Sequence, residues 1–139
     1  MRYLGIDYGD RQIGLAAGSI DTGLAARLPV LKSHGWERDI RRIIETLAAE
    51  NIGAIVIGLP LNMDGTEGKR AEITRKFGAL LEDASGLNVI YHDERLTSRE
   101  ATSLLLSQGY SRQRIRPILD SVSARLILED YFRTCQPKQ

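Results

Sequence analysis

An almost unbroken apolar run from Ile52 to Leu59, with Ile55-Val56-Ile57 at its centre, constrains the fold of this chain more than any other segment. Gly58 and Pro60 end the run, and its length suits a strand better than a helix. A strand that is apolar on both faces needs cover on both faces, which parallel strands receive from flanking helices. The run therefore predicts an α/β domain.

Two shorter apolar stretches precede this strand, from Arg2 to Asp7 and from Gln12 to Gly18. The turn Tyr8-Gly9-Asp10-Arg11 separates them, and Gly and Asp in so short a connection are typical of a hairpin. A third strand is predicted around Ala26 to Lys32. Apolar residues then recur every three or four positions from Trp36 to Glu50, which predicts an amphipathic helix.

Strands and helices alternate in the second half of the chain. The predicted elements are a helix from about Thr66 to Ala84, a strand from Leu87 to Tyr91, a helix opened by a Thr97 and Glu100 capping box and running to about Ser107, and a last helix from about Asp120 to Phe132. A hairpin followed by such alternation predicts a mixed sheet of five strands flanked by helices. We expect residues 1–139 to form a single domain, because this length and a 42% hydrophobic composition suit one core.

Several classes of protein are disfavoured by the composition. Asp7 stands where a signal peptide needs apolar residues, and no window approaches about 18 apolar residues, so we expect a soluble, cytoplasmic protein without membrane contact. Cys135 has no Cys or His at a metal-ligand spacing, which excludes a disulfide framework and a zinc site. A net charge of +1 is weak evidence for a polyanionic partner, so the distribution of charge matters more.

Four carboxylates at the ends of predicted elements are candidates for chemistry. Asp7 ends the first strand, Asp93 and Glu94 close a later strand, and Asp120 begins the last helix. Because side chains alternate across a strand, only one of Asp93 and Glu94 should face a shared site. Each carboxylate also has a structural alternative: Asp7 could bond its own turn, the strand-end pair could bind Arg95, and Asp120 could be an N-cap.

Carboxylates from three separate elements, without a matching His or Cys set, suit Mg²⁺ or Mn²⁺ better than zinc. Phosphate oxygens and water would complete the coordination of such ions. His92 lies next to the predicted site and could assist water activation if its ring faced inward.

The segment from Gly58 to Gly68, GLPLNMDGTEG, is a polar loop richer than a minimal connection between a strand and a helix requires. Backbone N–H groups near Gly65 and Thr66, at the expected helix start, could hold a phosphate, and Asn62 could bond a sugar or base edge. A capped turn is the structural alternative.

Basic residues near these segments are candidates for binding nucleic acid. Arg112, Arg114 and Arg116 follow Tyr110 in a segment expected to be exposed and partly mobile, and Arg95 adjoins Glu94. A solvated surface run is the alternative for the three alternating arginines.

Four stretches together resemble the YqgF/RuvX family over nearly the whole chain. They are Gly5-Ile6-Asp7-Tyr8-Gly9 with Ile13-Gly14, the GLPLNMDGTEG segment, DERLTS at 93–98, and Asp120 before Ala124. The resemblance implies an RNase H-like fold, kinship with Holliday-junction resolvases and a role in maturing the 5′ end of small-subunit ribosomal RNA in bacteria. It also implies an acidic triad of Asp7, Glu94 and Asp120, with Asp93 as the fallback for Glu94.

One position departs from the family pattern. Where similar proteins have Thr followed by Lys, this chain has Asp10-Arg11, so a hydroxyl that could meet a phosphate is replaced by a carboxylate. Phosphate binding by this turn is therefore not carried over from the family.

From these residues and this resemblance, we expect a metal-dependent endonuclease acting on pre-16S rRNA, with branched DNA as a further substrate class. Two divalent ions, bridged by Asp7 and held by Glu94 and Asp120, would activate water and stabilise the leaving oxygen. Ribosomal precursor particles are expected partners, and monomer and homodimer both remain open. The alternatives are a non-catalytic RNA-binding assembly factor, and a sugar-kinase-like ATPase whose usual two-lobed cleft needs a longer chain.

Overall fold

A mixed sheet of five strands forms the middle layer of the molecule in the computed structural model, which describes residues 1–95 and 97–135. The strands are β1 (Arg2–Tyr8), β2 (Gln12–Ser19), β3 (Leu24–Lys32), β4 (Ala54–Leu59) and β5 (Val89–Asp93), in the order β3-β2-β1-β4-β5. The first three strands are antiparallel, whereas β4 and β5 run parallel to β1. The predicted mixed five-stranded α/β sheet is confirmed.

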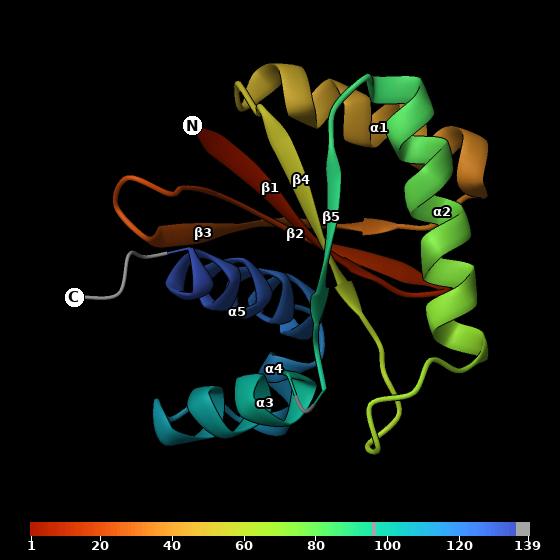
Figure 1. Ribbon diagram of the computed structural model, residues 1–139. Helices are drawn as coiled ribbons and strands as arrows, with labels where there is room; N and C mark the ends of the chain where they lie inside the picture. The colour runs from red at the N-terminus through yellow and green to blue at the C-terminus, as the bar shows by residue number, and fades with distance from the viewer. Residues whose placement is uncertain (96, 136–139) are drawn as a thin grey trace.

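Helices cover both faces of this sheet (Figure 1). On one face lie α1 (Trp36–Ala49) and α2 (Lys69–Ser85), and on the other lies α5 (Leu119–Thr134). Two further helices, α3 (Thr97–Ser107) and α4 (Arg112–Ile115), lie beside α5 and share a small core with it. This double cover explains the apolar run in β4, because every residue of that strand is buried. None of the described helices is long and apolar enough to cross a membrane.

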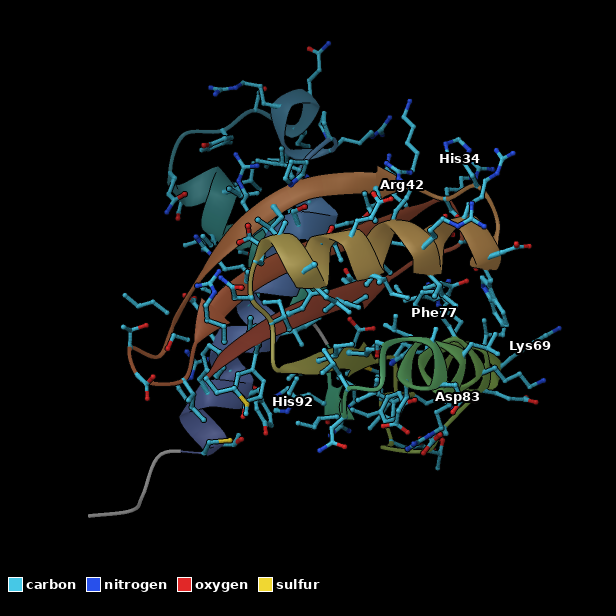
Figure 2. All side chains as sticks on the ribbon, turned by 90° about the horizontal axis from the view of Figure 1, so that it is seen from above. His34, Arg42, Lys69, Phe77, Asp83 and His92 are labelled. Carbon is cyan, nitrogen blue, oxygen red and sulfur yellow. The ribbon has the colours of Figure 1, made fainter. Side chains whose placement is uncertain are left out.

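The central strand β1 divides its side chains between the two faces. Leu4, Ile6 and Tyr8 pack toward α1 and α2, where the Tyr8 ring stacks on Phe77 with centroids 4.5 Å apart. Figure 2 shows Phe77 between these two helices. Burial of each large apolar side chain is worth about 1.5 to 3 kcal/mol, so this layer anchors β1 firmly. The alternating positions of β1, which include Asp7, therefore face α5.

Two segments differ from the sequence-based prediction. Helix α2 begins at Lys69 rather than near Thr66, because a bridge between Leu61 and Glu67 keeps the preceding residues in a closed loop. The segment expected to be partly mobile contains α4, whose N-cap Ser111 accepts a hydrogen bond from the N–H of Arg114. One turn is too short to show helical periodicity, which is why the sequence pattern did not predict α4. The predicted capping box involves the side chain of Thr97, which lies outside the described part of the chain.

Glycines in β1 and β2 allow α5 to approach the sheet closely. A Cβ added at Gly5 would lie 2.9 Å from the carbonyl oxygen of Ala124 and 2.9 Å from the Cβ of Leu128. One added at Gly14 would lie only 1.9 Å from the carbonyl oxygen of Asp120. Backbone atoms cannot rotate out of the way, so a side chain at Gly14 would displace the start of α5.

We therefore expect Gly14→Ala to lower the free energy of unfolding by about 1 to 3 kcal/mol, the usual cost of overpacking. Urea denaturation followed by circular dichroism measures this change. Gly53→Ala is the matched control, because its added methyl group would meet only the flexible side chain of Met1, at 3.0 Å. Equal losses in both variants would contradict the close approach of α5 at Gly14.

Candidate active site

Asp7 lies near the end of the central strand, between two glycines of the neighbouring strands. In β2, Gly14 is the residue paired with Asp7. On the other side, β1 pairs with β4 through Ile6 and Ile57, which sets Gly58 beside Asp7. Neither neighbour has a Cβ, so the sheet surface on both sides of the Asp7 carboxylate is open to residues from other elements.

The other two predicted carboxylates come from the residues that occupy these open positions. The main chain of Asp120 lies over Gly14, as described above, and the side chain of Glu94 lies over Gly58. A Cβ added at Gly58 would be 2.8 Å from Oε2 of Glu94. Gly14, Asp7 and Gly58 thus lie side by side on three strands. Around them Asp7, Glu94 and Asp120 line one cavity of about 430 Å³.

At the end of β5, the carboxylates of Asp93 and Glu94 lie in different places, as side-chain alternation predicts. Asp93 forms an ion pair with Arg95, with Oδ2 and Nη2 2.9 Å apart, and does not line the cavity. The N–H of Glu94 donates to the carbonyl of Leu59 at 3.2 Å, and its carboxylate faces the cavity. The structural alternative of a strand-end ion pair therefore applies to Asp93 and not to Glu94.

Asp120 occupies the first turn of α5. The N-cap of this helix is Ile118, and no side-chain hydrogen bond caps it, so the expectation that Asp120 might be only an N-cap is wrong. An anionic side chain in a first turn is stabilised by the free N–H groups there. The Asp120 carboxylate thus reaches the cavity without serving as a cap.

Burial raises the pKa of all three carboxyl groups. The pKa of Asp7 lies well above 3.8, first because of burial and then because of the negative charges of Glu94 and Asp120. Burial raises the pKa of Glu94 to about 7 and also raises that of Asp120. The nearby cation Arg70 acts in the opposite direction on Asp7 and Glu94. Carboxylates held this close bind a proton or a cation more readily than isolated ones do.

The donor set suits a divalent cation. Asp7 and Glu94 are within hydrogen-bonding reach of each other, and Asp120 lines the same cavity. Buried oxygen donors without nitrogen or sulfur partners match Mg²⁺ or Mn²⁺. Within residues 1–95 and 97–135, however, no three His, Cys, Asp or Glu side chains are grouped closely enough to form a complete metal site. The structure therefore shows a carboxylate pair able to hold a cation, with a third carboxylate nearby.

The loop residues predicted to bind phosphate do not line this cavity. The N–H of Gly65 donates to the Asn62 carbonyl at 2.8 Å, and the N–H of Thr66 donates to Oδ1 of Asp64 at 3.0 Å. Nδ2 of Asn62 donates to Oγ1 of Thr66 at 2.9 Å. The prediction placed Gly65 and Thr66 at a helix start with free N–H groups, and that geometry is wrong. The alternative of a capped turn describes this loop.

The predicted basic residues are dispersed. Arg95 lines the cavity, but its guanidinium also binds Asp93 and donates to the carbonyl of Met63 at 3.1 Å, which ties the loop to β5. Arg116 lines a neighbouring cavity, whereas the guanidinium of Arg114 lies over the ring of Tyr110, 4.7 Å from its centroid. Arg112 lines neither cavity.

Two cavity-lining arginines, Arg70 and Arg99, were missed by the sequence analysis. Each stands in the first turn of a helix that follows a carboxylate-bearing or glycine-rich segment. That position is the signal that could have identified them. His92 does not line the cavity of the carboxylates, and its Nε2 lies 2.6 Å from Oδ2 of Asp130 on α5.

The mixed five-stranded sheet with helices on both faces is an RNase H-like fold. Thermus thermophilus RuvC in complex with a Holliday junction substrate has the same fold, with a TM-score of 0.64, 17% identity and coverage of 99% of this chain and 98% of RuvC. The fowlpox virus resolvase in complex with Holliday junction DNA follows, with a TM-score of 0.57, 14% identity and coverage of 99% and 100%. At these identities the likeness shows the fold alone.

Sequence comparison identifies the family of the chain. The family model RuvX, described as Holliday junction resolvase, matches residues 1–134. A relative from Anaeromyxobacter sp. (strain Fw109-5) is 41% identical over 132 residues, 95% of this chain and 96% of the relative. One from Azotobacter vinelandii is 42% identical over 129 residues, 93% and 91% of the two chains, and both are provisionally named as pre-16S rRNA nuclease. The chain belongs to the RuvX family, and it is accordingly a nuclease-type hydrolase.

The raised pKa of Glu94 predicts how the stability of metal-free protein depends on pH. The folded state binds the Glu94 proton more tightly than the unfolded state, so this contribution is fully present below about pH 4.5 and is lost as pH rises through 7. The loss is at most roughly 3 kcal/mol. Urea unfolding in chelator between pH 4.5 and 8 measures it against Glu94→Gln, in which the group cannot titrate.

The exposed Glu72→Gln is the control for this measurement, because Glu72 is paired only with Lys76 on the surface of α2. As the pH rises, the free energy of unfolding should fall equally in wild type and Glu72→Gln. In Glu94→Gln it should fall less. Parallel curves for all three proteins would show that Glu94 does not titrate in this range.

Proposed function

We propose that this protein is a metal-dependent endonuclease that hydrolyses phosphodiester bonds in ribosomal RNA precursors. The observation that carries the proposal is the gathering of Asp7, Glu94 and Asp120 around one cavity that arginines also line. Buried carboxylates with raised pKa values favour a divalent cation, and guanidinium groups favour a phosphate. Metal-dependent hydrolysis of a phosphodiester uses both.

Each group of the cavity has a distinct task in this proposal. Asp7 and Glu94 hold the cation or cations between them, and Asp120 supplies the third carboxylate. Divalent ions bound there supply the activation of water and the stabilisation of the leaving oxygen. Arg70 and Arg99 bind the phosphate and orient it toward Asp7. Arg95 holds the loop that forms one wall, through its bonds to Asp93 and the Met63 carbonyl.

The names of the relatives support pre-16S rRNA as the substrate. Cleavage at its 5′ end is the part of the proposal that comes from the family resemblance. Such an enzyme acts in the cytoplasm, on free precursor RNA or on ribosomal precursor particles. Branched DNA is the second candidate substrate, favoured by the resolvase description of the family. A non-catalytic assembly factor would use the same arginines without turnover, and it would have no need of the carboxylates.

Asp7→Asn, Glu94→Gln and Asp120→Asn should each reduce cleavage of a pre-16S rRNA fragment on the order of a hundredfold or more, because each removes an anionic ligand worth several kcal/mol in the transition state. Cleavage is followed by gel electrophoresis, and circular dichroism confirms folding. The exposed Asp83→Asn should cleave like wild type. Loss of activity in Asp93→Asn with full activity in Glu94→Gln would transfer the role to Asp93.

Mg²⁺ or Mn²⁺ should support cleavage, whereas Ca²⁺ should bind and support little, because its larger radius and looser coordination place water poorly for attack. A readout independent of activity is thermal unfolding, in which Mn²⁺ should raise the Tm of wild type by several degrees and that of Asp7→Asn much less. Rapid cleavage by protein shown to be free of metal would refute this mechanism.

A further inference from the structure

A second cavity of about 360 Å³ opens beside the first. It is lined by Gly9, Arg11, Gln12, Arg116, Leu119 and Asp120, and two of these residues, Gly9 and Asp120, also line the cavity of the carboxylates. The two cavities therefore meet at a ridge formed by the β1–β2 turn and the first turn of α5. The proposed function involves neither the second cavity nor Arg11.

The charges of the second cavity suit an anion. Two arginines, Arg11 and Arg116, and one carboxylate residue, Asp120, are among the residues that line it. Both arginine side chains are exposed, and within residues 1–95 and 97–135 neither has a hydrogen bond or an ion pair from its guanidinium. Other arginines of the chain are used internally, for example Arg75 with Glu67 and Arg2 with Glu50. Arg11 and Arg116 are thus available to a ligand.

The ridge between the cavities is low and rigid. Gly9 contributes no side chain to it, and a Cβ added there would lie 2.7 Å from the Gln12 carbonyl oxygen. The N–H of Ser33 donates to the Arg11 carbonyl at 2.8 Å, which fixes the turn against the end of β3. Gly9 therefore places no side chain between the two cavities, and the main chain of Arg11 is held beside them.

We infer that the second cavity binds a phosphodiester group of the same RNA strand whose neighbouring phosphodiester lies among the carboxylates. Arg11 and Arg116 hold the strand beside the cleaved bond, while Arg70 and Arg99 bind the phosphate that is cleaved. This inference rests on the proposed function. It assigns a binding role to the Asp10-Arg11 turn, where the chain departs from the usual residues of its family. The group that binds is the guanidinium of Arg11 instead of a hydroxyl.

The arrangement selects the class of substrate. A strand held on both sides of Gly9 and Asp120 must continue past the cleaved bond, so the substrate is an internal linkage of an RNA strand. A terminal nucleotide would fill one cavity and leave the other empty. Internal cleavage should therefore be strongly preferred over removal of nucleotides from an end.

The test combines a change in the protein with a change in the substrate. Once the cleaved bond in a single-stranded RNA is mapped, a neutral methylphosphonate replaces the phosphodiester next to it, on one side or the other. In wild type, neutralising the linkage bound by Arg11 and Arg116 should raise KM about tenfold and change kcat less than twofold. In the double variant Arg11→Ala with Arg116→Ala, KM should already be raised, and the same methylphosphonate should add almost nothing.

Arg133→Ala is the matched control. Arg133 lies near the other end of α5, about 20 Å from Asp120 along the helix, and its exposed pair with Asp130 contributes little to stability. This variant should respond to the methylphosphonate as wild type does. Independent, additive effects of the double variant and the neutral linkage, or no effect of the double variant, would overturn the inference.

A binding measurement separates this inference from the proposed function. With uncleaved single-stranded RNA in chelator, wild type should lose affinity as salt rises, and each lost phosphate contact should reduce the logarithmic slope by about 0.7. Arg11→Ala with Arg116→Ala should show the reduced slope, and Arg133→Ala should not. Absence of cleavage with this binding pattern intact would refute the nuclease while supporting the second cavity. Cleavage with an unchanged slope in Arg11→Ala with Arg116→Ala would support the nuclease and refute the second cavity.

Discussion

The close packing of α5 on the glycines of β1 and β2 is the contact on which the rest of this structure depends. Only without a Cβ at Gly14 can the carbonyl of Asp120 come within reach of the sheet surface beside Asp7. The same absence of a side chain at Gly58 admits the carboxylate of Glu94. Small residues in three adjacent strands thus determine the place of the carboxylates, while the large apolar residues on the opposite face hold the strands in register.

This arrangement has an electrostatic cost that the surrounding fold must offset. Three carboxyl groups with raised pKa values lie around one cavity, and burial is the first cause of the shift in each. Arg70 reduces the repulsion only in part. The buried layer around Tyr8 and Phe77 supplies stability next to the very strand that carries Asp7. A well-packed face and a poorly neutralised face therefore belong to the same central strand.

The sequence was informative wherever a pattern is local. The apolar run at Ile55-Val56-Ile57 predicted a doubly covered strand, and alternation along a strand separated Asp93 from Glu94, as the structure has them. It was uninformative where a contact joins distant residues. Nothing near Arg70 or Arg99 in the sequence shows that both reach the cavity of Asp7. Such features depend on the tertiary fold.

The position of α5 also determines when the cavity becomes complete during synthesis. Asp7 and Glu94 belong to the sheet and its edge, whereas Asp120 belongs to the last helix that the structure describes. A nascent chain that still lacks α5 exposes the α5-facing surface of β1, with its glycines uncovered and only two of the three carboxylates in place. Catalytic competence by the proposed mechanism consequently requires that α5 has been synthesised and has packed on the sheet.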